Sequence, residues 1–200
     1  MIAIVDYGMG NLRSVQKAFE YLGFEATITR SEHVLQHADK ILLPGVGAFE
    51  HAMRELKRHG LDERINYEVA KGKPLLGICL GMQLLFDVSY ENGVHNGLGI
   101  LPGEIVRIPA PRVKVPQVGW NSLKISKREP LFAGLPEEPY VYFVHSYYLQ
   151  TKANVVSATT FYGDELAVAA QRDNVFALQF HPEKSGDIGL QILKNFGGLK

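Results

Sequence analysis

Apolar positions in the first half of the chain form short runs that alternate with longer segments of helical spacing. Leu12, Val15 and Phe19 are three and four residues apart, which predicts an amphipathic helix over residues 11–22. The alternation of such helices with apolar runs is typical of a parallel sheet covered by helices. The predicted strands are residues 1–6, 25–29, 40–43 and 75–78, and a second predicted helix spans residues 48–57.

In the second half of the chain the spacing changes to a two-residue alternation. From residue 104 onward Pro, Val and Tyr are frequent, and runs such as Tyr140-Val141-Tyr142-Phe143-Val144 have the pattern of strands. We expect mixed or antiparallel strands here and a closing helix at 187–196, with one domain over residues 1–200 and no internal repeat. The expected strands are residues 140–144, 155–161, 167–170 and 175–179.

The composition narrows the range of partners and locations. The 200 residues are 46% hydrophobic, enough for one sizeable core, and carry 21 basic and 21 acidic residues. This balance provides no basic surface for nucleic acid or an anionic membrane, so a small neutral or zwitterionic substrate fits better. The first residues lack a basic leader, no apolar run is long enough to span a bilayer, and one cysteine leaves no disulfide framework. We therefore expect a cytoplasmic protein in a reducing compartment.

The single cysteine, Cys79, lies in Gly77-Ile78-Cys79-Leu80-Gly81, between a predicted strand and a segment of helical spacing at 82–86. Glycines on both sides of a strand-to-helix turn are typical of a nucleophile elbow. The pattern places the thiol facing solvent above a helix N-terminus, whose partial positive charge favours the thiolate that attacks carbonyl carbon. The alternative is a small buried residue of a core strand, which is the usual fate of a free cysteine.

A cysteine nucleophile needs a base and a group that orients the base. His181 and Glu183, in Phe180-His181-Pro182-Glu183, follow the apolar strand at 175–179. Pro182 stiffens the turn, so the imidazole and the carboxylate can lie side by side. His181 then keeps its proton on the nitrogen that faces Glu183 and offers the other nitrogen to Cys79. A surface histidine beside a solvated acid is the alternative.

Acyl chemistry also needs donors for an oxyanion. Pro44-Gly45-Val46-Gly47 follows a predicted strand and opens a helix. Its backbone N–H groups, that of Val46 above all, can therefore lie beside the elbow, with the Leu80 N–H as the other donor. Taken alone the motif is weak, because most such turns simply connect a strand to a helix.

Two further patterns are set aside. Gly8-Met9-Gly10 does not continue as a dinucleotide-binding fingerprint, because Arg13 stands where the third glycine is required. The remaining histidines show no metal-ligand grouping with acids, so we expect no metal site and solvated side chains at His33, His37, His51, His59 and His95.

The motifs at residues 44–47, 77–83 and 180–183 occur in the order found in the class I (triad) glutamine amidotransferases, which the chain resembles over essentially its full length. Within that superfamily, residues 116–121 and 145–147 and the Val46 of the glycine turn are similar to the glutaminase subunits of imidazole glycerol phosphate synthase. The resemblance implies a flavodoxin-like α/β fold, with a central mixed and largely parallel sheet flanked by helices. It also implies that Cys79 attacks the side-chain amide of glutamine, that His181 passes a proton to the departing ammonia, and that water hydrolyses the thioester.

The resemblance assigns further residues by position. Those that match the glutamine-binding positions are Gly47, Leu80, Gln83, Glu91, Ser146 and Tyr147, with Glu91 as the partner of the substrate ammonium group. Those that match the subunit interface are Asn11, Trp120, Tyr142 and Lys184. The implied partner is a separate (βα)8-barrel cyclase subunit, which uses the ammonia to make imidazole glycerol phosphate in histidine biosynthesis. No metal or organic cofactor is implied.

Two alternatives stay open. The glutaminase subunit of pyridoxal phosphate synthase shares the triad but not the patterns at residues 44–47 and 116–121. A non-catalytic interaction subunit that kept the fold is more distant, because Cys79, His181 and Glu183 are all intact. Since Val46 replaces the second glycine found in many sister glutaminases, we also expect its peptide to rest in an inactive orientation until the partner and its ligand shift it.

Overall fold

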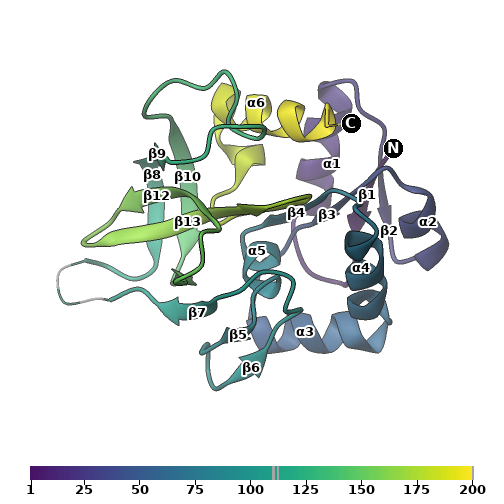
Figure 1. Ribbon diagram of the computed structural model, residues 1–200, viewed down its shortest axis with the longest axis horizontal. Helices are drawn as coiled ribbons and strands as arrows, with labels where there is room; N and C mark the ends of the chain where they lie inside the picture. The colour runs from purple at the N-terminus through teal and green to yellow at the C-terminus, as the bar shows by residue number, and fades with distance from the viewer. Residues whose placement is uncertain (110, 112, 200) are drawn as a thin grey trace.

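The computed structural model describes residues 1–109, 111 and 113–199 and shows an α/β protein built on a large sheet (Figure 1). The parallel part of the sheet has the strand order β2-β1-β3-β4-β14. All residues of its four central strands are buried, because helices cover a parallel sheet on both faces. The strands are β2 (Ala26–Thr29), β1 (Ile2–Val5), β3 (Lys40–Leu43), β4 (Leu75–Ile78) and β14 (Val175–Leu178).

Helices cover both faces of this parallel part (Figure 1). Ile4 of β1 packs in the core cluster that contains Phe19, whereas its neighbour Val5 packs in the opposite cluster with Leu56 and Ile65. This division follows from the two-residue period of a strand. The helices are α1 (Leu12–Tyr21) and α6 (Gly186–Gly197) on one face, and α2 (Glu32–His37), α3 (Phe49–Arg58) and α4 (Leu61–Ala70) on the other. Among the described residues, no helix has the length and apolar character needed to cross a membrane.

Beyond β14 the sheet continues with mostly antiparallel pairing. The order runs from β14 through β13, β11, β7 and β5 to β6, while β12 pairs with β13 and β9. These strands are β13 (Glu165–Arg172), β11 (Tyr147–Gln150), β7 (Glu104–Arg107), β5 (Val88–Ser89), β6 (His95–Asn96), β12 (Val156–Phe161) and β9 (Lys124–Ile125). A separate antiparallel pair, β8 (Gln117–Ser122) with β10 (Tyr140–His145), lies beside β12 (Figure 1).

The predicted elements agree closely with the observed ones where the apolar pattern is strong. The predicted strands at 40–43 and 75–78 have the observed bounds, and the closing helix differs by a residue at each end. The sequence analysis did not identify α2 or α4. In α4 the charged residue Glu68 is buried, where its carboxylate contacts Arg64 and Lys73. A charge on the buried face interrupts the helical apolar pattern, although the two ion pairs that permit its burial are formed by residues close in sequence.

The candidate site lies where the carboxyl ends of the parallel strands meet. Leu43 of β3 pairs with Gly77 of β4, and Leu178 of β14 pairs with Ile78. The residues that follow these strands therefore emerge at the same edge of the sheet, which is the usual place of ligand sites in open α/β sheets.

Candidate active site

Cys79 occupies a strained turn between β4 and α5 (Leu80–Leu84). Its backbone has φ 54° and ψ −114°, a conformation that is unfavourable for any residue with a Cβ. The flanking glycines are required by space: a Cβ on Gly81 would lie 1.7 Å from the Leu43 carbonyl oxygen, and one on Gly77 would lie 2.8 Å from the Gly81 carbonyl oxygen. The predicted elbow is therefore present.

The surroundings of the thiol differ from the expectation in two respects. Cys79 is only 7% exposed and lies in the wall of a cavity of about 340 Å³, so the thiol does not face open solvent. The helix that follows has five residues, 80–84, instead of continuing through residue 86. A helix of this length has few aligned peptides, so stabilisation of a thiolate depends mainly on neighbouring side chains.

His181 and Glu183 form a buried pair beside Cys79. The Nδ1 of His181 lies 2.9 Å from Oε1 of Glu183, and their side chains are 6% and 2% exposed. Burial alone lowers the pKa of His181, but hydrogen bonding and charge attraction from Cys79 and Glu183 outweigh it and raise this pKa to about 10. At neutral pH the imidazole beside the sulfur is therefore protonated.

The turn that carries this pair is tied to strand β10. The His181 N–H donates to the Tyr142 carbonyl at 3.0 Å, and the Tyr142 N–H donates to Oγ of Ser185 at 3.0 Å. The Ser185 hydroxyl in turn donates to the His181 carbonyl at 2.7 Å. This closed ring of hydrogen bonds fixes the backbone of His181 relative to β10.

The glycine turn lies next to the elbow in an orientation that hides both expected oxyanion donors. The Leu80 N–H donates to the Gly45 carbonyl at 3.3 Å. Since the C=O and N–H of a trans peptide point in opposite directions, the Val46 N–H faces away from the elbow. Gly47 has φ 105°, and a Cβ there would lie 2.5 Å from Cε of Met9. This is the peptide orientation that Val46 led us to expect, and its inactivity stays a prediction.

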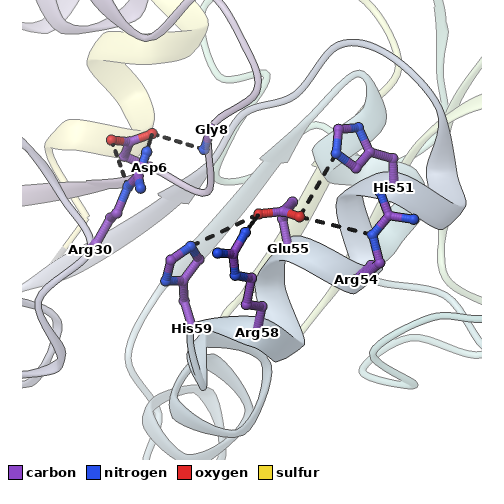
Figure 2. A network of polar contacts seen from close by, with 8 residues as sticks. All are labelled: Asp6, Gly8, Arg30, His51, Arg54, Glu55, Arg58 and His59. Atoms are coloured by element: carbon purple, nitrogen blue, oxygen red, sulfur yellow. Dashed lines mark hydrogen bonds and ion pairs between the residues drawn. The ribbon is translucent and has the colours of Figure 1, made fainter.

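The loop that follows β1 contacts the glycine turn. The Asp6 carboxylate accepts from the Gly8 N–H at 2.9 Å and from Nε of Arg30 at 3.0 Å (Figure 2). Burial opposes the charge on Asp6, but these two donors hold its pKa below the usual value. The loop places Tyr7, which is fully buried, so that its hydroxyl donates to the Pro44 carbonyl at 2.8 Å.

The residues expected to hold glutamine surround the same cavity as Cys79 and His181. Gly47, Leu80, Ser146 and Tyr147 line it, as do the side chains of Gln83 and Glu91. Glu91 also accepts the Phe49 N–H at 2.7 Å, so it satisfies the otherwise uncapped N-terminus of α3 directly after the glycine turn. The cavity therefore offers a carboxylate as well as the thiol of Cys79.

Of the four expected interface residues, Lys184 lines this cavity and the other three do not. Lys184 is in its wall, whereas Trp120 and Tyr142 face each other across β8 and β10, with ring centroids 6.0 Å apart. Trp120 is 57% exposed, so it is not a core residue. Asn11 lies at the start of α1 beside a different cavity, one lined by residues of α1 and β2.

Several polar residues of the site were not singled out from the sequence. Gln179 is fully buried between Cys79 and Gln83, and His145 is buried between Gln117 and the backbone of Tyr147. The one available signal was a polar residue at the end of an apolar strand, two positions before His181. Such a position is also common for ordinary loop residues, so the pattern alone did not identify it.

Solved structures with low sequence identity share this fold. A structure described as a glutamine amidotransferase aligns with a TM-score of 0.77 over 100% of both chains at 22% identity. A structure described as PurLQS from Thermotoga maritima aligns with a TM-score of 0.77 over 98% of this chain and 96% of the other at 20% identity. At these identities the likeness establishes the class I glutamine amidotransferase fold alone.

Sequence comparisons are more specific. The profile of the family "Glutamine amidotransferase class-I" matches residues 3–197. The chain is 52% identical to "Imidazole glycerol phosphate synthase subunit HisH" of Syntrophotalea carbinolica over 100% of both chains. It is 50% identical to the protein of the same name from Chlorobaculum tepidum over 98% of both chains. The chain thus belongs to the class-I glutamine amidotransferases, within the group of imidazole glycerol phosphate synthase HisH subunits.

Proposed function

We propose that this chain is the glutaminase subunit of an imidazole glycerol phosphate synthase, which hydrolyses glutamine and delivers the ammonia to a partner subunit. The observation that carries the proposal is the buried array of Cys79, His181 and Glu183 in the wall of a cavity of about 340 Å³. The chain is about half identical to proteins named as HisH subunits over nearly its full length, and this identity supports the proposal.

The chemistry follows from the charges of the array. The Cys79 thiolate attacks the carboxamide carbon of glutamine, and a bond from sulfur to carbon forms. His181, which starts as an imidazolium, gives its proton to the departing nitrogen, so ammonia leaves and a thioester remains. Neutral His181 then takes a proton from water as the water attacks the thioester, which yields glutamate and restores the thiolate. Glu183 orients the imidazole through Nδ1 throughout.

The cavity provides for the charges of the substrate. The Glu91 carboxylate is the proposed partner of the glutamine ammonium group, and Gln83, Ser146 and Tyr147 contribute polar groups around the remaining atoms. Because Glu91 also holds the N-terminus of α3 through Phe49, the proposed ammonium site lies at the end of α3 that directly follows the glycine turn.

The resting glycine turn leads us to expect low activity of the isolated subunit. In the observed orientation the Leu80 N–H is used by the Gly45 carbonyl. Rotation of the Gly45 to Val46 peptide frees this donor and turns the Val46 N–H toward the developing oxyanion. Each such donor contributes on the order of a hundredfold or more to acyl transfer. We propose that the partner and its ligand favour the rotated state.

The names of the relatives imply a partner subunit. The strand pair β8 and β10 presents an exposed apolar surface to which such a subunit can bind. Trp120 and Val118 of β8 are 57% and 60% exposed and lie opposite Tyr142 and Val144 of β10. An exposed apolar surface of this kind marks an interaction site. Since β10 also holds His181 through its backbone, docking on this surface acts directly on the triad.

We propose that the partner is a (βα)8-barrel cyclase. It would use the ammonia on a phosphoribulosyl-formimino carboxamide nucleotide, and the products are imidazole glycerol phosphate and an aminoimidazole carboxamide ribonucleotide. Asn11 and Lys184 are proposed to complete the interface. A lone cysteine that must stay reduced to react supports the cytoplasmic location expected from the sequence. The names of the relatives favour this assignment over the pyridoxal phosphate synthase alternative.

The test uses the complex of the Cys79→Ala chain with the wild-type cyclase subunit. With ammonium salts at alkaline pH as the nitrogen source, the complex should form imidazole glycerol phosphate at the wild-type rate, because the synthase chemistry is untouched. With glutamine as the only nitrogen source it should form none. Product formation from glutamine would disprove the role of Cys79, and failure of ammonium to rescue would assign Cys79 to the synthase step.

A second measurement tests direct delivery of ammonia. The wild-type complex is given glutamine labelled with 15N in the side-chain amide, together with unlabelled ammonium. The product should keep most of the label, because the nascent ammonia stays inside the complex. Ready dilution of the label would show that ammonia escapes to bulk water before it is used.

A further inference from the structure

Gln179 is a fully buried polar residue that the mechanism above does not use. It follows β14 directly and its side chain lies between two residues of the site. Nε2 of Gln179 donates toward Sγ of Cys79 at 3.9 Å, and Oε1 of Gln179 accepts from Nε2 of Gln83 at 2.9 Å. A buried amide keeps such contacts because an unpaired donor or acceptor is costly in the interior.

The orientation of the Gln179 amide follows from its neighbours. The Tyr147 carbonyl can only accept hydrogen bonds, and Nε2 of Gln83 lies 3.5 Å from it. Gln83 therefore presents its NH2 group on this side, and the atom of Gln179 that faces this NH2 group has to be the oxygen. It follows that the NH2 group of Gln179 points toward the sulfur of Cys79.

The Tyr147 carbonyl is itself held by a second buried chain of hydrogen bonds. Nδ1 of His145 lies 2.8 Å from it, and Nε2 of His145 lies 2.8 Å from the side chain of Gln117. Burial, the largest influence, lowers the pKa of His145 to about 4, so the ring is neutral and donates from Nδ1 to the Tyr147 carbonyl, which can only accept. Nε2 then carries no hydrogen, so the Gln117 amide must turn its NH2 group, and not Oε1, toward it. The chain runs from β8 through β10 to the nucleophile, and each of its side chains is at most 7% exposed.

We infer that Gln179 is a positioning residue, whose amide N–H holds the Cys79 sulfur as a thiolate while its oxygen fixes the amide of Gln83. Because both hydrogens of the Gln83 amide are used inside the protein, its Oε1 is left to accept from a ligand in the cavity. The inference rests on the proposed function in that Cys79 is taken to be the nucleophile. The contact with the sulfur can nevertheless be tested without glutamine turnover.

The experiment measures the rate at which iodoacetamide alkylates the full-length chain as a function of pH. Because Cys79 is the only cysteine, the rate reports this sulfur alone. Gln179→Met keeps the length of the side chain and removes both hydrogen bonds. It should raise the pH midpoint of alkylation by about one pH unit, as expected for loss of one hydrogen bond to a charged group. Glutaminase kcat/KM of the complex should fall about tenfold or more.

A double variant separates positioning from structure. Gln179→Met leaves Nε2 of Gln83 without one of its acceptors, which by itself destabilises the fold. The double variant Gln83→Met with Gln179→Met removes both polar partners, so it should recover much of the lost stability. Its alkylation midpoint should stay as high as that of Gln179→Met, because the sulfur still lacks the donor. If the alkylation midpoint of the double variant returns to the wild-type value together with the stability, the inference is overturned.

The matched control is Gln171→Met, the same substitution at a partly buried amide that bonds the Glu129 carbonyl instead of the site. It should not move the midpoint. All variants keep the titratable groups that line the cavity or interact with Cys79 and His181: Tyr7, Glu91, His145, His181, Glu183 and Lys184. An unshifted midpoint in both Gln179 variants overturns the inference even if turnover falls. Glutamine hydrolysis by Cys79→Ala would instead overturn the proposed function and leave the alkylation result standing.

Discussion

The backbone N–H of Leu80 donates a hydrogen bond to the carbonyl oxygen of Gly45 at 3.3 Å. This hydrogen bond joins the elbow at Cys79 to the glycine turn. It occupies an N–H group that is a proposed donor to the oxyanion in acyl transfer. A Cβ on Gly45 would lie 2.2 Å from the Tyr7 hydroxyl, so a glycine is needed for the turn to approach the elbow this closely. Cys79, the proposed nucleophile, therefore lines the cavity while the Leu80 N–H, a proposed oxyanion donor, is occupied.

Val46→Gly should raise the glutaminase activity of the isolated chain about tenfold. Rotation of the Gly45 to Val46 peptide changes φ of residue 46 by about 180°, which brings a β-branched residue toward positive φ at a cost of roughly 1–2 kcal/mol. Glycine does not carry this cost. Steady-state release of glutamate measures the effect, with the full complex as the reference. Unchanged or lower basal activity would show that Val46 does not hold the turn closed.

His181→Asn should lower kcat of the complex by about a thousandfold or more, whereas Glu183→Gln should lower it by roughly ten- to a hundredfold. The first removes the group that carries the proton. The second keeps an acceptor for Nδ1 of His181, and a thiol needs less activation than an alcohol. Equal losses in the two variants would mean that the charge of Glu183, and not its orienting contact, is essential.

His145 should make the protein less stable as the pH falls from about 6.5 toward 4. Its pKa is lowered from 6.5 to about 4 in the folded state, chiefly by burial. In this window the unfolded chain binds a proton that the folded chain does not, so stability decreases with decreasing pH by up to roughly 3 kcal/mol. Urea unfolding at pH 7 and pH 4.5 measures the difference.

The control for this prediction is His145→Gln, which cannot titrate. All carboxylates remain in this variant, so it should still lose stability in acid. It should lack only the part of the stability loss that comes from protonation of His145. The same pH dependence in the variant and in the wild type would show that His145 becomes protonated in the folded state without penalty.

Trp120→Ala should weaken binding of the partner subunit by about a hundredfold, since a large exposed aromatic side chain at the centre of an apolar surface is the usual anchor of an interface. Tyr21→Ala is the matched control, because Tyr21 is 80% exposed at the end of α1, outside β8 and β10. Titration calorimetry with the cyclase subunit gives both affinities. Equal affinities of the two variants would place the interface elsewhere.

Lys184→Ala should reduce activation by the partner more than affinity for it. Lys184 lies in the wall of the catalytic cavity, one residue after Glu183 and in the turn that hydrogen bonds fix to β10. An ion pair that Lys184 forms with the partner subunit on docking would act on His181 through this turn. The ratio of glutaminase activity with and without the partner measures the effect, and wild-type values for both activation and affinity would contradict the assigned role.

The sequence by itself determined the parallel half of the sheet and the elbow at Cys79, and it supplied the residues of the proposed triad. Fully buried strands such as β3 and β4 are continuous apolar runs, and the glycines at positions 77 and 81 are demanded by contacts that admit no Cβ. The strand pattern and the contact of Gly77 with Gly81 are local, because the residues that cause them lie within a few positions of one another, whereas the contact that excludes a Cβ on Gly81 is with Leu43 of a different strand. His181 and Glu183 were found for the same reason, since two residues and a proline set their geometry.

Only the tertiary structure decided the state of the site. Whether the Leu80 N–H is free depends on a peptide 35 residues away at Gly45, and the contact of Gln179 with Cys79 spans 100 residues. The exposure of Trp120 and the neutral state of His145 likewise depend on which strands pack around them. Hydrogen-bond partners and burial are properties of the assembled chain, because they arise where segments distant in sequence meet, and no local pattern of residues encodes them.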